Sequence, residues 1–367
     1  MRLRSRPRPP ALALVFALFL LPLALSSCYL TEQASRYLAL HGRAVPVATA
    51  LADPRTSPAV RSFLERVARI RSFAEANFGL RQTKNYSSIV MLDSDRLATV
   101  VSACAELSFD TYEWSYPFLG KLPYRGYFDP KEAATEAARL RKAGWDVISR
   151  PVDAFSTLGW FSDPLFSFMA SYGESDVADT IIHEMTHATI WSHGHDQFNE
   201  ELATFVGGEG SLLYLASVYG PDSPELKRAT EDRADAEAFS AWLRGTADEL
   251  QTLYSSSLPP DEKRAQKAAI IAARAAAFKE QASQLFHGDA YRTFPMDRLN
   301  NAYLDLYRLY EGEPDLYRDF YQKVCGSSMR RFIEAVSRIA KQGGDPRVGM
   351  RRALASLPGA GQSTSQP

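Results

Sequence analysis

The stretch "DTIIHEMTHATIW", Asp179 to Trp191, carries two of the six histidines of this 367-residue chain. Residues four apart on an α-helix are rotated by only about 40° from one another, so His183 and His187 project from one face and can share one metal ion. Glu184 lies beside that face, where it can reach a water on the metal and act as general base. The spacing therefore predicts a metal-dependent hydrolase.

The alternative is an ordinary helix that carries these residues by chance. With six histidines, the pattern would arise by chance in roughly half a per cent of such chains. The flanks favour the metal site, because Val177, Ile181 and Met185 recur at helical spacing and Asp176 can cap the helix.

A catalytic zinc takes three protein ligands and leaves one position for water, so a third donor is required. His193 follows His187 by six residues, but Ile190 stands where that arrangement needs a glycine to turn the chain. On an unbroken helix His193 points about 240° away and rises about 9 Å. We therefore interpret His193 and His195 as solvated residues of the loop "SHGHD".

The segment "DQFNEELATFVGGEG" offers a better donor. Asp196 can cap a second helix, whose first turn contains Asn199 and Glu200. If the first helix ends near Gly194, the chain rises about 9 Å and the second helix returns about 6 Å, which brings Glu200 back to the metal. An exposed first-turn glutamate at the helix dipole is the alternative, and it suits Glu201. We expect Glu200 to be the third ligand.

The composition indicates a globular protein without a nucleic-acid partner. Hydrophobic residues make up 46% of the chain, which is ample for a buried core. The formal net charge is only −1 and the pI is near 6.6, so no basic field draws the chain onto nucleic acid.

The N-terminus is typical of an exported lipoprotein. Four arginines precede an uncharged run from Ala11 to Leu25, as in an export signal. A permanent transmembrane anchor is the alternative, but the run is shorter than the roughly 20 residues that span a bilayer. The run ends in "LSSC", which resembles the bacterial lipoprotein cleavage box. We therefore expect a signal peptide over residues 1–27, a lipid on Cys28, and a location on a bacterial membrane, facing the periplasm or the cell exterior.

Two further cysteines, Cys104 and Cys325, are too few for a disulfide framework in a domain of this size. They form either a single bridge or two free buried thiols.

The pattern of apolar residues predicts an α+β fold that is mostly helical. "SSIVML" and "ATVVSAC" flank the turn-like "DSD" and suggest a pair of strands; "WDVISRPV" is also strand-like, and Ala154 to Pro164 reads as an extended segment. We expect a small sheet packed near the metal helix and a helical C-terminal portion closing the cleft. The expected helices span Leu30–Ala52, Ser57–Phe78, Lys131–Ala143, Gln197–Tyr219, Ser223–Ser255, Pro260–Phe286, Asp297–Gly312 and Pro314–Ala340.

These elements predict one domain over residues 28–356. Its N-terminal helices cover residues 28–80, the sheet and the metal-binding helices cover 81–219, and a helical portion covers 220–340. The small and polar residues 357–367 predict a disordered tail.

Several stretches together resemble the predicted zinc-dependent aminopeptidases of bacteria, a group of gluzincin-type lipoproteins. They are "CYLTEQA", "LPYRGYFDP", "AFSTLGWFSDP", "IIHEMTH", "FNEELATFVGGEG" and "LNNAYL", in the family's order. The resemblance implies a zincin-like peptidase holding one zinc ion through His183, His187 and Glu200, with Glu184 as base. An acidic residue that often follows the ligand glutamate by four positions is Thr204 here, and no "GxMEN" segment is present.

The predicted reaction is attack of water on a peptide carbonyl, with Glu184 passing the proton to the leaving amine. Tyr124, Arg125 and Tyr127 are candidates for stabilising the oxyanion, although ordinary core or surface roles are the stronger interpretation. Ser156 and Thr157 lie in the extended segment that could pair with a substrate peptide, unless that segment is a turn that packs the sheet. Two other functions stay open: a membrane-anchored endopeptidase, and a lipoprotein whose metal site is non-catalytic and serves binding or assembly.

Overall fold

The computed structural model describes residues 29, 31–33, 35–116, 120–152, 163–308 and 313–357. The expected signal peptide, Cys28, Ser156 and Thr157 lie outside the described residues, as does the expected tail beyond residue 357. No helix among the described residues is both long enough and apolar enough to cross a membrane.

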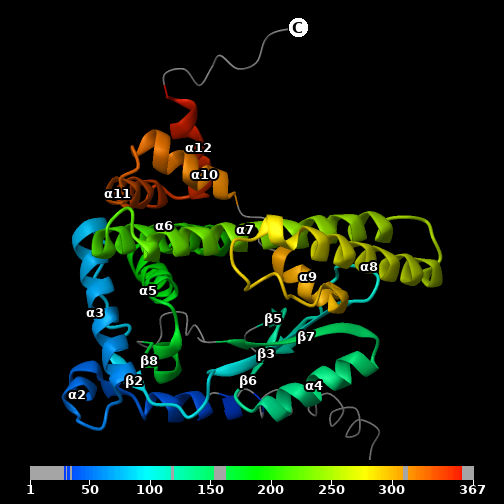
Figure 1. Ribbon diagram of the computed structural model, residues 1–367, viewed down its shortest axis with the longest axis horizontal. Helices are drawn as coiled ribbons and strands as arrows, with labels where there is room; N and C mark the ends of the chain where they lie inside the picture. The colour runs from blue at the N-terminus through cyan, green and yellow to red at the C-terminus, as the bar shows by residue number, and fades with distance from the viewer. Residues whose placement is uncertain are drawn as a thin grey trace, which may run out of the picture.

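The fold is α+β and mostly helical, as predicted (Figure 1). Residues 31–33 and 35–41 are helical. The helices that follow are α2 (Val47–Ala52), α3 (Pro58–Phe78), α4 (Pro130–Lys142), α5 (Glu174–Thr189), α6 (Asp196–Tyr219), α7 (Pro224–Tyr254), α8 (Pro260–Leu285), α9 (Asn301–Arg308), α10 (Pro314–Asp319), α11 (Met329–Ala340) and α12 (Pro346–Ala355). Short 3-10 turns span Ser167–Ser171 and Met296–Arg298, and a π-helical turn spans Phe320–Val324.

The strands form three small sheets. They are β1 (Val45–Pro46), β2 (Ser88–Val90), β3 (Ala98–Ala105), β4 (Trp114–Tyr116), β5 (Gly120–Leu122), β6 (Arg125–Tyr127), β7 (Trp145–Val152) and β8 (Leu165–Phe166). One sheet has the order β1-β2-β8, a second has β6-β3-β7, and β4 pairs with β5. The predicted strands β2 and β3 are therefore both present, but they belong to different sheets.

Strand β3 is the centre of its sheet and runs antiparallel to β6 and β7, with Val100 opposite Gly126 and Val101 opposite Ser149. Seven of its eight residues are buried, because helices cover both faces. Figure 1 shows α4 on one side of this sheet and α9 on the other. Such two-sided burial explains why β3 carries no charged residue and shows no alternation of buried and exposed positions.

The largest core joins α3, α5, α6 and α11 with the sheet β1-β2-β8. Helix α3 starts where predicted, because the Ser57 hydroxyl accepts from the Val60 backbone N–H and Pro58 follows at the first helical position. It ends at Gly79, whose φ of 76° is a left-handed conformation that favours glycine. The N-terminal helix α3 therefore shares one core with the helices of the candidate site.

Three helix predictions need correction. The stretch Leu30–Ala52 is not one helix, because residues 42–44 form a turn and β1 precedes α2. The stretch Pro314–Ala340 is divided by the π-helical turn and by residues 325–328. The stretch Asp297–Gly312 starts with a 3-10 turn, and α9 begins only at Asn301, while residues 309–312 lie outside the described residues. Helix α12 is one that the sequence pattern did not predict.

Cys104 and Cys325 are both free and buried in the described structure. Of the two interpretations, free buried thiols are therefore correct.

Candidate metal centre

Helix α5 carries the histidine pair on an amphipathic helix, as the spacing predicts. Its apolar face, which includes Ile181, Ile182 and Met185, is buried in the main core. The predicted cap is one turn out of place: the N-cap is Gly173, and Asp176 lies inside the first turn and accepts from the backbone N–H of Gly173. A carboxylate that reaches back in this way satisfies a donor that the helix itself leaves unpaired.

Helix α5 ends at Thr189, earlier than the predicted end near Gly194. The turn that follows is fixed by Asn199, whose side-chain oxygen accepts from the backbone N–H of Ser192 at 2.8 Å while its amide donates to the Ser192 carbonyl at 2.9 Å. His195, rather than Asp196, is the N-cap of α6, and Glu200 is therefore in the second turn. Asn199 thus sets where the second helix begins.

Two glycines let α5 and α6 approach closely. A Cβ added to Gly207 would lie 2.2 Å from an Asp179 carboxylate oxygen, 2.9 Å from the Asp179 carbonyl oxygen and 3.2 Å from the His183 Cβ. A Cβ on Gly210 would lie 2.9 Å from the ring of Phe78 and 3.0 Å from Ile182. The "VGGEG" segment therefore serves the packing that brings α6 against the histidine helix.

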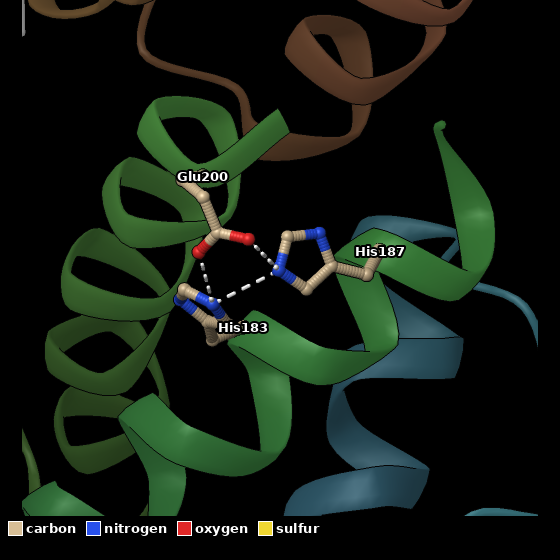
Figure 2. A group of neighbouring side chains, drawn as sticks. All are labelled: His183, His187 and Glu200. Carbon is tan, nitrogen blue, oxygen red and sulfur yellow. Dashed lines mark hydrogen bonds and ion pairs between the residues drawn. The ribbon is translucent and has the colours of Figure 1, made fainter. Parts of the chain in front are cut away.

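The two helices bring the three predicted ligands together, as Figure 2 shows. The Nε2 atoms of His183 and His187 are 3.1 Å apart. The Glu200 oxygens lie 3.6 Å from the His183 Nε2 and 3.4 Å from the His187 Nε2. One atom from each of three side chains therefore faces a common point.

This arrangement fits a metal ion. In a tetrahedral zinc site with ligand distances of roughly 2.0–2.1 Å, neighbouring ligand atoms are about 3.3–3.4 Å apart. The two Nε2 atoms are 3.1 Å apart, and each has a different Glu200 oxygen nearby: Oε2 is 3.6 Å from the His183 Nε2 and Oε1 is 3.4 Å from the His187 Nε2. These distances are close to that value. Two imidazoles and a carboxylate are also a donor set that zinc accepts in catalytic sites. The group of His183, His187 and Glu200 could hold a metal ion.

The charges of the site are strongly coupled. The imidazoles of His183 and His187 hold the pKa of Glu200 at about 2. Burial of His183 favours its neutral form, but Glu200, Glu184 and Asp179 outweigh burial and raise the pKa of the imidazole. The Glu200 side chain is 58% exposed, against 24% for His183 and 16% for His187, so the centre opens to solvent on the glutamate side.

Glu184 is half-buried beside the histidines. Burial raises the pKa of its carboxyl, the charges of both imidazoles oppose that shift, and the carboxylate of Asp163 adds to it. Glu184 in turn raises the pKa of Tyr86, a buried residue whose φ is 60°. Burial is the main cause of the Tyr86 shift.

Sequence reasoning missed Asp163 and Tyr86 as neighbours of Glu184. Asp163 precedes β8, and its carbonyl accepts from the Tyr86 backbone N–H at 2.7 Å. The left-handed backbone conformation of Tyr86 is rare for a bulky residue, and no sequence pattern predicts it. Only the fold brings these two residues to the histidine helix.

The C-terminal helices determine which glutamate faces the centre. Glu201 is not an exposed first-turn residue: its side chain is 12% exposed and accepts from the Tyr317 hydroxyl at 2.9 Å. The Arg347 guanidinium lies 3.5 Å from the same carboxylate. Because Glu201 is held on this side of α6, Glu200 turns toward α5.

The other candidates lie elsewhere. His193 is exposed, in keeping with the solvated loop, whereas His195 is half-buried at the start of α6. Tyr124 is 44% exposed. Arg125 and Tyr127 belong to β6, where the Arg125 guanidinium and the Tyr127 ring both contact the Tyr29 ring. Ser156 and Thr157 are outside the described residues.

The fold and this site define a mostly helical α+β protein with a candidate metal centre between two helices. A family model described as "Putative aminopeptidase" matches residues 28–348, and the chain belongs to that family. Comparison with curated proteins and with solved structures gave no match.

Proposed function

We propose that the protein is a zinc-dependent aminopeptidase. The observation that carries the proposal is the convergence of His183, His187 and Glu200 on one point, with Glu184 on the same helix as the histidines. Membership of an aminopeptidase family supports the substrate class, a peptide with a free N-terminus.

In this proposal, His183 and His187 hold zinc through Nε2 and Glu200 holds it through its carboxylate. When bound, zinc would act as a Lewis acid that polarises water and the peptide carbonyl. Glu184 takes the proton from the attacking water and delivers it to the nitrogen of the leaving amine, so the peptide C–N bond breaks and a carboxylate forms. The raised pKa of its carboxyl suits a group that must both accept and release a proton.

The half-buried Asp163 supports aminopeptidase activity rather than endopeptidase activity. Its carboxylate lies near Glu184, and it accepts from the Tyr37 hydroxyl at 3.3 Å. A carboxylate beside the base can pair with the α-ammonium group of a substrate.

We further propose that the protein is exported and held on a bacterial membrane by a lipid on Cys28. The motif "LSSC" after an arginine-rich, then apolar N-terminus supports this location. The near-neutral net charge supports peptide substrates over nucleic acid.

The test compares matched peptides with free and with acetylated N-termini, using zinc-loaded protein. An aminopeptidase releases the first residue only from the free peptides. Cleavage of both peptides at internal bonds would establish the endopeptidase instead. Zinc binding without any hydrolysis, in a protein that is folded, would favour the non-catalytic metal site.

A further inference from the structure

The first described residue of the chain is held firmly in the folded domain. The Tyr29 hydroxyl donates to the Gly126 carbonyl, and the Arg125 guanidinium lies 3.8 Å from the centre of the Tyr29 ring. The same ring lies 5.8 Å from the Tyr116 ring and 5.7 Å from the Tyr127 ring. We call Tyr29, Tyr116, Arg125 and Tyr127 the Tyr29 cluster.

Further contacts fasten the residues after Tyr29 to the same region. The Phe128 backbone N–H donates to the Gln33 side chain at 3.4 Å, and Arg36 pairs with Glu132 at 3.0 Å. The N-terminal helical residues therefore lie against β6 and the start of α4. The described residues from Tyr29 to Arg36 are therefore fastened to the domain.

Cys28 directly precedes Tyr29 in the sequence. A lipid on Cys28 would therefore leave the protein beside the Tyr29 cluster. An anchor this short holds the neighbouring surface close to the headgroups, whereas a flexible linker would let the domain rotate away.

The surface next to the cluster has the chemistry of a membrane interface. Lys121 in β5 is 66% exposed, and its ammonium group lies 2.9 Å from the Glu113 carboxylate. The connection between β5 and β6 presents Pro123, which is exposed, and Tyr124, which is 44% exposed. Tyrosine is favoured where one end of a side chain is apolar and the other is wet. Glu113 balances the charge of Lys121, so the contact with headgroups rests on Tyr124 and on the position of the chain end at Tyr29 rather than on net charge. We call Lys121, Pro123 and Tyr124 the headgroup face.

We propose that the headgroup face lies directly against the lipid bilayer that carries the lipid of Cys28, so that the domain is docked on the membrane in one orientation. This inference rests on the proposed lipid attachment, but it does not depend on zinc or on hydrolysis. Figure 1 places α12 at the opposite end of the molecule from β6, with α5 and α6 between them. The metal centre would thus stand at a fixed height above the headgroups.

The test uses the full-length lipidated protein in vesicles of phosphatidylethanolamine and phosphatidylglycerol that contain a nitroxide-headgroup lipid. A fluorophore is attached at Tyr124→Cys or, as a matched control, at Val348→Cys on α12, which is 49% exposed. Labelling is specific because Cys104 and Cys325 are buried and Cys28 would carry the lipid. We expect severalfold stronger quenching at position 124 than at position 348.

A second variant tests the role of the cluster. Arg125→Ala removes the guanidinium from the Tyr29 ring, so quenching at position 124 should fall toward the value at position 348 while vesicle flotation stays complete. Equal quenching in the Tyr124→Cys and Val348→Cys proteins, both with Arg125 intact, would contradict the docked orientation but not the lipid anchor. If the full-length protein does not float with the vesicles, both the lipid attachment and the docking are contradicted. Neither result bears on zinc content or peptide cleavage, which are measured on the same samples.

Discussion

The metal centre and the Tyr29 cluster both gather polar side chains from segments far apart, but they use them differently. In the Tyr29 cluster the groups contact one another, since the Tyr29 hydroxyl donates to a backbone carbonyl and the Arg125 guanidinium covers the Tyr29 ring, while the Arg125 Nε is buried without a hydrogen-bond partner among the described residues. In the metal centre two ring nitrogens face each other at 3.1 Å, where they share at most one proton. Ligand atoms of three side chains turned toward a common point indicate a binding site, whereas side chains stacked on one another indicate a structural cluster.

The largest expected effect comes from a substitution that removes one metal ligand and leaves the Tyr29 cluster intact. Glu200→Ala removes one of three ligands, so bound zinc should fall from one ion per chain to nearly none, measured by elemental mass spectrometry after dialysis. The fold should persist, because the Glu200 side chain is largely exposed.

Glu201→Ala is the matched control for Glu200→Ala. It should keep zinc and lose stability, because Tyr317 and Arg347 lose their shared partner. The ligand assignment is wrong if Glu201→Ala or His193→Ala strips the metal while Glu200→Ala retains it.

The next substitution separates zinc binding from peptide hydrolysis. Glu184→Gln keeps the size of the side chain but cannot take a proton, so kcat should fall by about 10²–10⁴-fold with zinc still bound. Peptide turnover and zinc content are measured on one preparation. Full activity in this variant would remove Glu184 from the role of base.

Gly207→Ala tests the close packing on which the centre depends. The new methyl group meets Asp179 and the His183 Cβ, so we expect a loss of about 1–3 kcal/mol in the free energy of unfolding and weaker zinc binding. Chemical denaturation and a zinc titration measure the two quantities. Gly245→Ala on α7 is the control, because its Cβ meets only the end of the Arg274 side chain at 3.4 Å. Unchanged stability in Gly207→Ala would show that α5 and α6 are not tightly apposed.

Arg125→Ala breaks the Tyr29 cluster instead. Loss of the cation–π contact should lower the free energy of unfolding by about 1–2 kcal/mol. Zinc content should stay unchanged, because the contacts of Arg125 are with the cluster. Loss of zinc in a folded Arg125→Ala protein would contradict the separation of the two regions.

The last prediction concerns pH and the buried carboxyl group of Asp179. Burial raises the pKa of Asp179 to about 6 in the folded protein, although His183 and Arg233 oppose it, and the unfolded value is about 3.9. The folded state therefore binds the proton more tightly, and stability falls as the pH rises from about 4 through about 6. In chelator-treated protein, Asp179→Asn should abolish this loss, which is on the order of 3 kcal/mol once the pH is well above 6. Denaturation at several pH values measures it, and an unchanged slope would contradict the burial of this carboxylate.

Local spacing predicted the part of the site that one helix creates. His183, Glu184 and His187 follow from the period of α5, and Glu200 follows from a return helix of suitable length. The rotation of α6 was not predictable, because Tyr317 and Arg347 hold Glu201 from more than a hundred positions away. Tyr86 and Asp163 likewise reach Glu184 only through the tertiary fold.

The fold class followed from apolar periodicity, but strand pairing did not. Strand β2 joins β8 in parallel, with Ile89 opposite Leu165, and nothing near β2 in the sequence specifies that partner. The early end of α5 depends on the bond between Asn199 and Ser192 across the turn. Such contacts lie beyond what periodicity within one element can show.

The central claim is that two imidazoles and one carboxylate form a zinc site with an open position. Zinc K-edge X-ray absorption on the purified, zinc-loaded protein tests it directly. The account predicts two imidazole ligands, the remaining donors being oxygen at roughly 2.0–2.2 Å, and loss of the protein oxygen donor together with the metal in Glu200→Ala. A sulfur ligand, or a third imidazole retained after that substitution, would contradict it.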